Sequence, residues 1–198
     1  MNEALRAELP AMAREDLRVR SELASDGSLF DGYHPRMQEV HETNARRLLE
    51  IVSQYGWPGR AVAGEEGAEA AWLIVQHAIG LPAFQRRCLE LLQTAASDGE
   101  VPPWQPAYLL DRILVFEGKP QVYGTQFDTD EHGEMTPCPV EDAASLNALR
   151  ASIGLDSIEE RTRMMRAQAK GENERSPSDR ADHQRRYHEW LKRVGWRD

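Results

Sequence analysis

Apolar residues recur at three- and four-residue steps along much of the chain, which is the spacing of one face of an α helix. The clearest case begins at Pro35, a residue favoured in the first turn of a helix, and ends at a Gly-Trp-Pro-Gly turn that starts with Gly56. The stripe on this segment consists of Met37, Val40, Asn44, Leu48, Ile51 and Tyr55. It therefore contains an amide, Asn44, and His41 lies at its edge.

The segment after Gly64 is apolar all round the helical circumference, which is typical of a helix buried on most sides. It ends in Gln76 and His77, just before a Gly-Leu-Pro break. Another amphipathic helix is predicted from that break to residue 95. Residues 11–24 are predicted to form an exposed first helix.

A further helix is predicted to open at Pro106, with Asp111 and Arg112 set between its apolar residues. After Gly118 the period changes from helical to two. Residues 121–127 and 135–140 are therefore predicted to pair as a β-hairpin, which is marginal alone and has to pack on helices.

Two more helices are expected, over residues 142–152 and 157–170. The pattern as a whole predicts a mainly α fold, a helical domain of about six to eight helices with a small β-hairpin near residues 121–140. The domain is expected to span residues 1–170.

A Gly-, Asn-, Ser- and Pro-rich stretch over residues 171–181 is predicted to be a linker. Residues 182–198 then form an amphipathic C-terminal helix, whose apolar residues include Trp190 and Leu191. It either docks on its own domain or forms a homo-oligomer with a second copy, and a solvated tail is the alternative.

Composition restricts the cellular compartment and the classes of partner that are expected. The chain has two cysteines, too few for a disulfide framework, and its first 23 residues contain no apolar run of the kind found in a secretory signal, so a cytoplasmic protein is expected. The longest apolar run is too short to span a bilayer, so no membrane partner is predicted. Residues 161–198 carry 11 Lys and Arg against 6 Asp and Glu, whereas the other residues carry 13 against 27. Such an acidic body would repel phosphates, so no nucleic-acid partner is expected.

Gln76 and His77 are the most informative polar pair, because a buried amide or imidazole is costly unless it is hydrogen-bonded. They belong either to a binding site or to a structural network, and the same two readings apply to His41 and Asn44. Asp111 and Arg112 could likewise form a network or a ligand site, since Arg suits carboxylate and phosphate groups.

The segment from residue 121 to residue 126 is dense in groups that donate and accept hydrogen bonds. Such groups bind polar or peptide-like ligands through hydrogen bonds, but they are poor acids and bases. The candidates for substrate binding in this segment are Gln121, Tyr123, Thr125 and Gln126.

Three functional hypotheses follow from these residues. The first is an enzyme for a small polar or peptide-like substrate, with His77 as general acid or base, Asp111 as its orienting group, and Arg112 with the glutamines binding the substrate. The second is a non-catalytic binding or protein-interaction module. The third is a metal-dependent hydrolase with His41, His77 and Asp111 as ligands, although the sequence contains no metal or cofactor motif and none is assigned.

A series of short motifs resembles a widespread bacterial family that is classed as a domain of unknown function. The motifs are Tyr-Gly-Trp-Pro from Tyr55, Gln-His-Ala from Gln76, Leu-Asp-Arg from Leu110, and Glu-Gly-Lys-Pro-Gln-x-Tyr-Gly-Thr-Gln from Glu117. The resemblance covers roughly residues 35–156. The resemblance implies a shared helical fold, and it does not imply any particular reaction. The chain departs from the family pattern at Leu149, where the first of two adjacent arginines is expected, which leaves Arg150 as the remaining cation.

Overall fold

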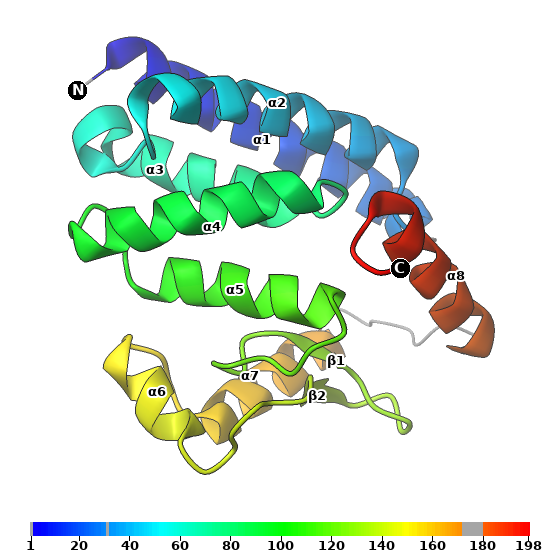
Figure 1. Ribbon diagram of the computed structural model, residues 1–198. Helices are drawn as coiled ribbons and strands as arrows, with labels where there is room; N and C mark the ends of the chain where they lie inside the picture. The colour runs from blue at the N-terminus through cyan, green and yellow to red at the C-terminus, as the bar shows by residue number, and fades with distance from the viewer. Residues whose placement is uncertain (1, 31, 172–179) are drawn as a thin grey trace. The chain divides into compact units, whose positions relative to one another are not determined.

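The computed structural model describes residues 2–30, 32–171 and 180–198, and over these residues the protein is mainly helical (Figure 1). The described residues form eight α helices, one short 3-10 helix and one two-stranded antiparallel sheet. Contacts within the chain divide it into an N-terminal unit, Met1–Pro102, and a C-terminal unit, Pro103–Asp198. The domain boundary expected near residue 170 stays a prediction.

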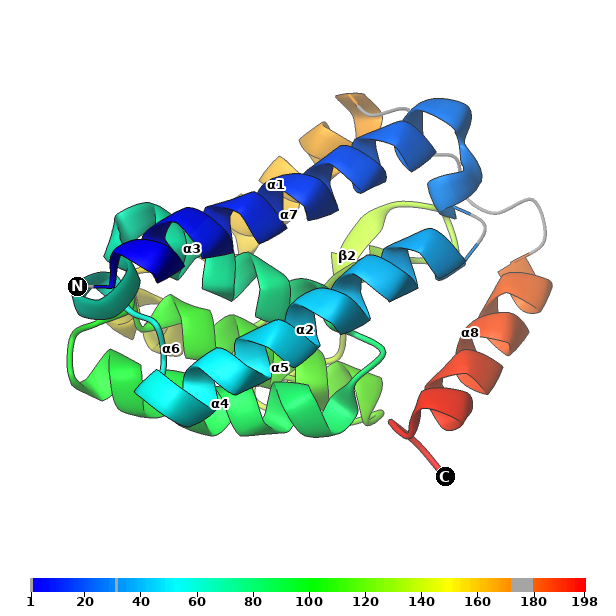
Figure 2. The same cartoon turned by 90° about the horizontal axis from the view of Figure 1, so that it is seen from above.

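The N-terminal unit is a group of four helices in which α3 packs against each of the other three (Figures 1 and 2). A short 3-10 helix, η1, links α1 to α2. The bounds are α1 Glu3–Asp26, η1 Ser28–Phe30, α2 Pro35–Tyr55, α3 Arg60–His77 and α4 Pro82–Ser97.

Helix α1 differs from the expected exposed helix over residues 11–24, which is a correction in both length and burial. It begins at Glu3, because the Asn2 side chain caps it by accepting hydrogen bonds from the backbone N–H groups of Ala4 and Leu5. One face of the helix is buried along its whole length. The buried residues are Leu5, Leu9, Pro10, Asp16, Val19 and Leu23. The helix is therefore part of the core, and a carboxylate stands in its apolar stripe.

Helices α2, α3 and α4 follow the predicted pattern closely. Pro35 opens α2, and the His34 side chain caps it by accepting a hydrogen bond from Arg36 N at 3.1 Å. Gly64 interrupts α3 with φ 72° and ψ 177°, a conformation that only Gly adopts easily, so the regular helix starts after it as predicted. In α4, Pro82 stands in the first turn.

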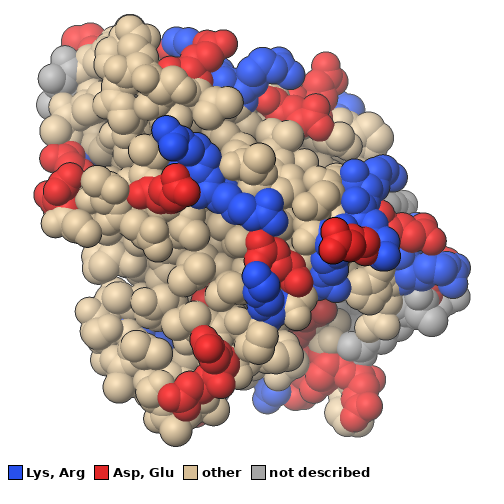
Figure 3. All heavy atoms as spheres, viewed as in Figure 1, with Lys and Arg blue, Asp and Glu red and all other residues tan. Residues whose placement is uncertain are grey.

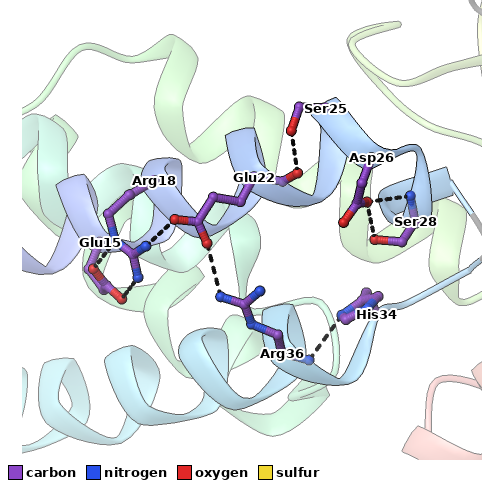
Figure 4. Close-up of polar contacts among 8 residues, drawn as sticks. All are labelled: Glu15, Arg18, Glu22, Ser25, Asp26, Ser28, His34 and Arg36. Carbon is purple, nitrogen blue, oxygen red and sulfur yellow. Dashed lines mark hydrogen bonds and ion pairs between the residues drawn. The ribbon is translucent and has the colours of Figure 1, made fainter.

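An exposed ion pair connects the first two helices (Figure 4). Arg36 at the start of α2 lies 3.0 Å from a carboxylate oxygen of Glu22 on α1, and Glu22 also contacts Arg18. Solvent-exposed pairs of this kind contribute little, about 0–1 kcal/mol each. The packing of α1 against α2 and α3 therefore depends mainly on the buried stripe.

The C-terminal unit contains the hairpin and four helices. The bounds are α5 Trp104–Phe116, β1 Phe127–Thr129, β2 Met135–Pro137, α6 Leu146–Ser152, α7 Ile158–Gly171 and α8 Arg180–Val194. The hairpin is shorter than expected. Gln121 makes only an isolated bridge with Val140, and residues 122–126 form no strand, so the prediction of a strand from residue 121 is wrong. The reason is that side chains hold residues 122–125. Only the ends of the segment, Gln121 and Gln126, hydrogen-bond to the backbone of residues 138–141.

Helix α8 and the residues after it pack on the end of α5. The rings of Trp190 and Trp196 contact the ring of Phe116, with centroids 5.9 and 5.0 Å away. The Arg197 guanidinium donates hydrogen bonds to the backbone oxygens of Phe116 and Val115 at 2.8 and 3.0 Å. The tail thus docks within its own unit, which is one of the alternatives expected for it.

Most of the predicted linker over residues 171–181 lies outside the described residues. Within the described ranges, none of the helices combines the length and the apolar character needed to cross a membrane. On the face shown in Figure 3, basic and acidic side chains are interspersed.

Candidate functional site

A cluster of one carboxylate and two imidazoles lies inside the N-terminal unit. Asp16 comes from the middle of α1, His41 from the second turn of α2, and His77 is the last residue of α3. One possible ligand atom from each of the three residues lies within 4.8 Å of the other two. Three consecutive α helices therefore bring their polar groups to one point.

Helix periodicity explains why these side chains meet. Asp16 lies in the buried stripe of α1, seven residues after Leu9 and three before Val19, so it points to the same side as the apolar residues. His41 lies one turn from Met37 and Asn44 on the buried face of α2. Val19, Leu23 and Met37 form an apolar cluster beside this site. Both histidines are among the residues predicted from the sequence, and Asp16 is not. The signal for Asp16 is a carboxylate at a position of the apolar stripe of α1.

Asp16 is the centre of the cluster. Nδ1 of His77 lies 2.8 Å from Oδ1 of Asp16, and Nε2 of His41 lies 3.3 Å from Oδ2. The two imidazole rings are 5.4 Å apart, centre to centre. His77 thus has Asp16 as its carboxylate partner, the part that the sequence analysis gave to Asp111.

Tyr33, in the loop before α2, extends the cluster by one group. Its hydroxyl lies 2.8 Å from Nδ1 of His41, and the two rings stack with centroids 5.6 Å apart. Gly80, just after α3, leaves the space for the Tyr33 ring, because a Cβ there would be 3.2 Å from Cε1 of Tyr33. Burial, together with the charges of Glu42 and Asp16, raises the pKa of Tyr33, so the hydroxyl keeps its proton.

The cluster is buried at Asp16 and reached by solvent at His77. The side chains of Asp16, His41 and His77 are 1%, 9% and 25% exposed. Burial works to raise the pKa of Asp16, but its contacts with His41 and His77 outweigh burial and hold the pKa well below its ordinary value. The carboxylate is therefore ionised throughout the neutral pH range.

Asp111, the other acidic candidate, accepts hydrogen bonds from a loop in the C-terminal unit. Both of its oxygens accept hydrogen bonds from residues 122–125, at 2.8–3.1 Å. The donors are Val122 N, Tyr123 N, Thr125 N and the Thr125 hydroxyl. The Asp111 side chain thus replaces the partner strand that the backbone would otherwise need.

Gln121 and Arg150 also form hydrogen bonds with this loop. The Gln121 amide donates to the backbone oxygens of Gln126 and Cys138 and accepts from Gln126 N, at 2.8–3.0 Å. The Arg150 guanidinium donates to the backbone oxygens of Tyr123, Gly124 and Asp156 at 2.7, 3.1 and 2.6 Å. These contacts account for the density of polar groups in residues 121–126.

The other candidates make smaller contributions. Asn44 donates to the backbone oxygen of Met12 at 3.3 Å, which ties α2 to α1. Gln76 is buried, next to His77. Arg112 Nε lies 3.3 Å from Oε1 of Gln126. Burial lowers the pKa of Arg112 to about 10, so it is still a cation at neutral pH.

The predicted site residues therefore belong to two groups. His41, His77, Asn44 and Gln76 are in the N-terminal unit, where the first two meet Asp16. The others are in the C-terminal unit, around the loop over residues 121–126. The assignment of His77 and Asp111 to one site remains a prediction.

The fold and the cluster define a mainly helical protein with a buried carboxylate that contacts two histidines. The chain belongs to the family of unknown function DUF6624, whose match covers residues 3–172 and thus includes the cluster and the loop. Neither a search of curated proteins nor a search of solved structures found a match.

Proposed function

We propose that this protein is a hydrolytic enzyme for a small polar or peptide-like substrate, in which Asp16, His41 and His77 activate the attacking water. The observation that carries the proposal is the contact of His77 Nδ1 with Asp16 Oδ1 at 2.8 Å, between a half-buried imidazole and a fully buried carboxylate. An imidazole that is oriented by a buried carboxylate and reached by solvent is a common arrangement for a base that acts on water.

In this proposal His77 keeps the acid–base role inferred from the sequence, and Asp16 takes the orienting role first given to Asp111. The hydrogen bonds of Asp111 support the change, because both of its oxygens already accept from the loop. Gln76, adjacent to His77, is the proposed substrate-binding amide of this unit.

The chemistry requires the water to lose a proton as its oxygen bonds to the electrophilic atom of the substrate. The bond to the leaving group then breaks, and the leaving group takes up a proton. The cluster can accept the proton directly through an imidazole, or it can hold a metal ion that acidifies the water. Both routes use the same three side chains.

The polar groups of the C-terminal unit support a second, non-catalytic role for that unit. Asp111, Gln121 and Arg150 shape the loop over residues 121–126 through buried hydrogen bonds. A loop that is held so firmly is suited to present backbone and side chains to a bound molecule. Arg112 and Gln126 are the proposed contacts with such a molecule.

The test of the hydrolase is His77→Gln, assayed with a panel of chromogenic ester, amide and phosphoester substrates. Loss of the acid–base group is expected to lower the rate by a factor of about 10²–10⁴. The control is His132→Gln, the same change at a histidine with a side chain that is 77% exposed, which should leave the rate unchanged. A panel on which the wild-type protein is inactive, or on which His77→Gln is as fast as the wild type, would contradict the proposal.

The setting proposed for this activity is the bacterial cytoplasm. Both cysteines are free, and Cys88 is buried, which fits a reducing compartment.

A further inference from the structure

We infer that Asp16, His41 and His77 bind one divalent transition-metal ion of the zinc class. The inference rests on the proposed function and selects its second route, in which a metal ion bound by the three side chains, rather than the His77 imidazole itself, activates the water. It is carried by the positions of the ligand atoms, by two buried atoms without hydrogen bonds, and by the contact of Tyr33 with His41.

The ligand atoms are spaced as a metal ion requires. Zinc binds imidazole nitrogen and carboxylate oxygen at about 2.0–2.2 Å in tetrahedral geometry, which places neighbouring ligand atoms about 3.3 Å apart. The contacts of Asp16 with His77 and His41 measure 2.8 and 3.3 Å, and one possible ligand atom from each residue lies within 4.8 Å of the other two. An ion can therefore be placed among the three groups with small side-chain movements.

Two atoms of the cluster are buried without a hydrogen bond. These are Oδ2 of Asp16 and Nε2 of His41, which face each other across 3.3 Å. Their one contact is with each other, as an ion pair that lacks the geometry of a hydrogen bond. Burial of polar atoms without a well-formed hydrogen bond costs up to about 1–3 kcal/mol each. A cation bound to both atoms removes this cost.

The contact of Tyr33 with His41 is one that a metal-binding histidine requires. A histidine that ligates a metal almost always uses its other ring nitrogen in a hydrogen bond, which sets the tautomer and the ring orientation. Nδ1 of His41 is engaged by the Tyr33 hydroxyl at 2.8 Å. When Nδ1 carries the proton, Nε2 presents a lone pair toward Asp16 Oδ2, and two acceptors then face each other. That arrangement suits a cation.

The charges and the solvent access around the three ligands also favour a bound metal ion. Asp16 is a buried anion, and its contacts within the described residues are with histidines, which are neutral when they bind a metal. His77 is the last residue of α3, where the partial negative charge of the helix end favours a cation. Three protein ligands leave a coordination position for water, as in catalytic zinc sites, and solvent reaches the cluster at His77.

The experiment is a titration of the full-length, metal-free protein with Zn²⁺ and with Co²⁺, which gives visible absorption bands when it is bound. The expected result is one equivalent of bound ion and a higher melting temperature. Asp16→Asn and His41→Gln should each weaken binding at least a hundredfold, and Tyr33→Phe about 10- to 100-fold. His132→Gln, at the exposed histidine, should bind as the wild type does. If the wild-type protein binds neither ion, or if Asp16→Asn binds as tightly as the wild type, the inference is overturned.

The metal site and the hydrolase can fail separately. Hydrolysis that survives complete removal of metal, but is lost in His77→Gln, would refute the metal ion and leave the hydrolase in place. Tight binding of one ion at these ligands, with no hydrolysis of any substrate in the panel, would leave the metal site and refute the hydrolase. Circular dichroism of each variant shows whether it is folded, and the wild-type titration decides the inference even if a variant does not fold.

Discussion

Replacement of Asp111 by Ala is expected to lower the free energy of unfolding of the C-terminal unit by about 3–5 kcal/mol. Asp111 is fully buried and accepts from three backbone N–H groups and one hydroxyl of the loop. The change leaves these donors without an acceptor in the interior. Chemical denaturation followed by circular dichroism measures the effect.

Asp142→Ala is the matched control for Asp111→Ala. Asp142 also accepts hydrogen bonds from two backbone N–H groups and a hydroxyl, of Ala144 and Ser145, but it is exposed. Water can replace it, so a loss of about 1 kcal/mol or less is expected. Equal losses for the two variants would show that the loop does not depend on a buried acceptor.

Arg150→Met is expected to cost about 2–4 kcal/mol. The variant loses the hydrogen bonds of a charged group, but it no longer buries a charge, and Met fills part of the space. The guanidinium donates to three backbone oxygens, and Arg150 is 1% exposed. Denaturation of the variant measures the loss. Arg163→Met, at an arginine whose side chain is 74% exposed and pairs only on the surface with Glu160, should change stability by less than about 0.5 kcal/mol.

Asp111 and Arg150 hold the same loop through opposite backbone groups. Asp111 accepts from Tyr123 N, and Arg150 donates to Tyr123 O. Removal of either side chain already loosens the loop. The double variant should therefore lose less free energy of unfolding than the sum of the two single losses. Additive losses would mean that the two side chains act on independent structures.

Periodicity is enough to locate α2, α3 and α4 of the N-terminal unit. Pro35 and Gly56 mark the ends of α2, and Gly64 marks the interruption of α3, because their backbone preferences act locally. Helix α1 was the exception. Its buried stripe is diluted by many charged residues on the other faces, so the pattern predicts an exposed helix and does not single out Asp16.

The loop over residues 121–126 could not be predicted from its alternating pattern. Alternation indicates a strand only when a neighbouring strand supplies the hydrogen bonds. Here Asp111 and Arg150 supply them, from positions 10 residues before and 24 residues after the loop. Side-chain contacts at such separations leave no local signal in the sequence.

Only part of the candidate site can be predicted from the sequence, because its members also come from separate segments. His41 and His77 stood out as polar residues in apolar segments, and the structure places both beside Asp16. Their partner could not be chosen from the sequence, because Asp16 and Asp111 are both carboxylates within helical segments. The choice depends on which helices pack together, and α1, α2 and α3 do so.

The most direct measurement of the central claim is an anomalous-scattering map from crystals of the full chain grown with excess zinc, recorded on both sides of the zinc absorption edge. We expect one strong peak about 2.0–2.2 Å from a carboxylate oxygen of Asp16 and from a ring nitrogen each of His41 and His77. A map without that peak, in which Asp16 is hydrogen-bonded directly to both imidazoles, would contradict it.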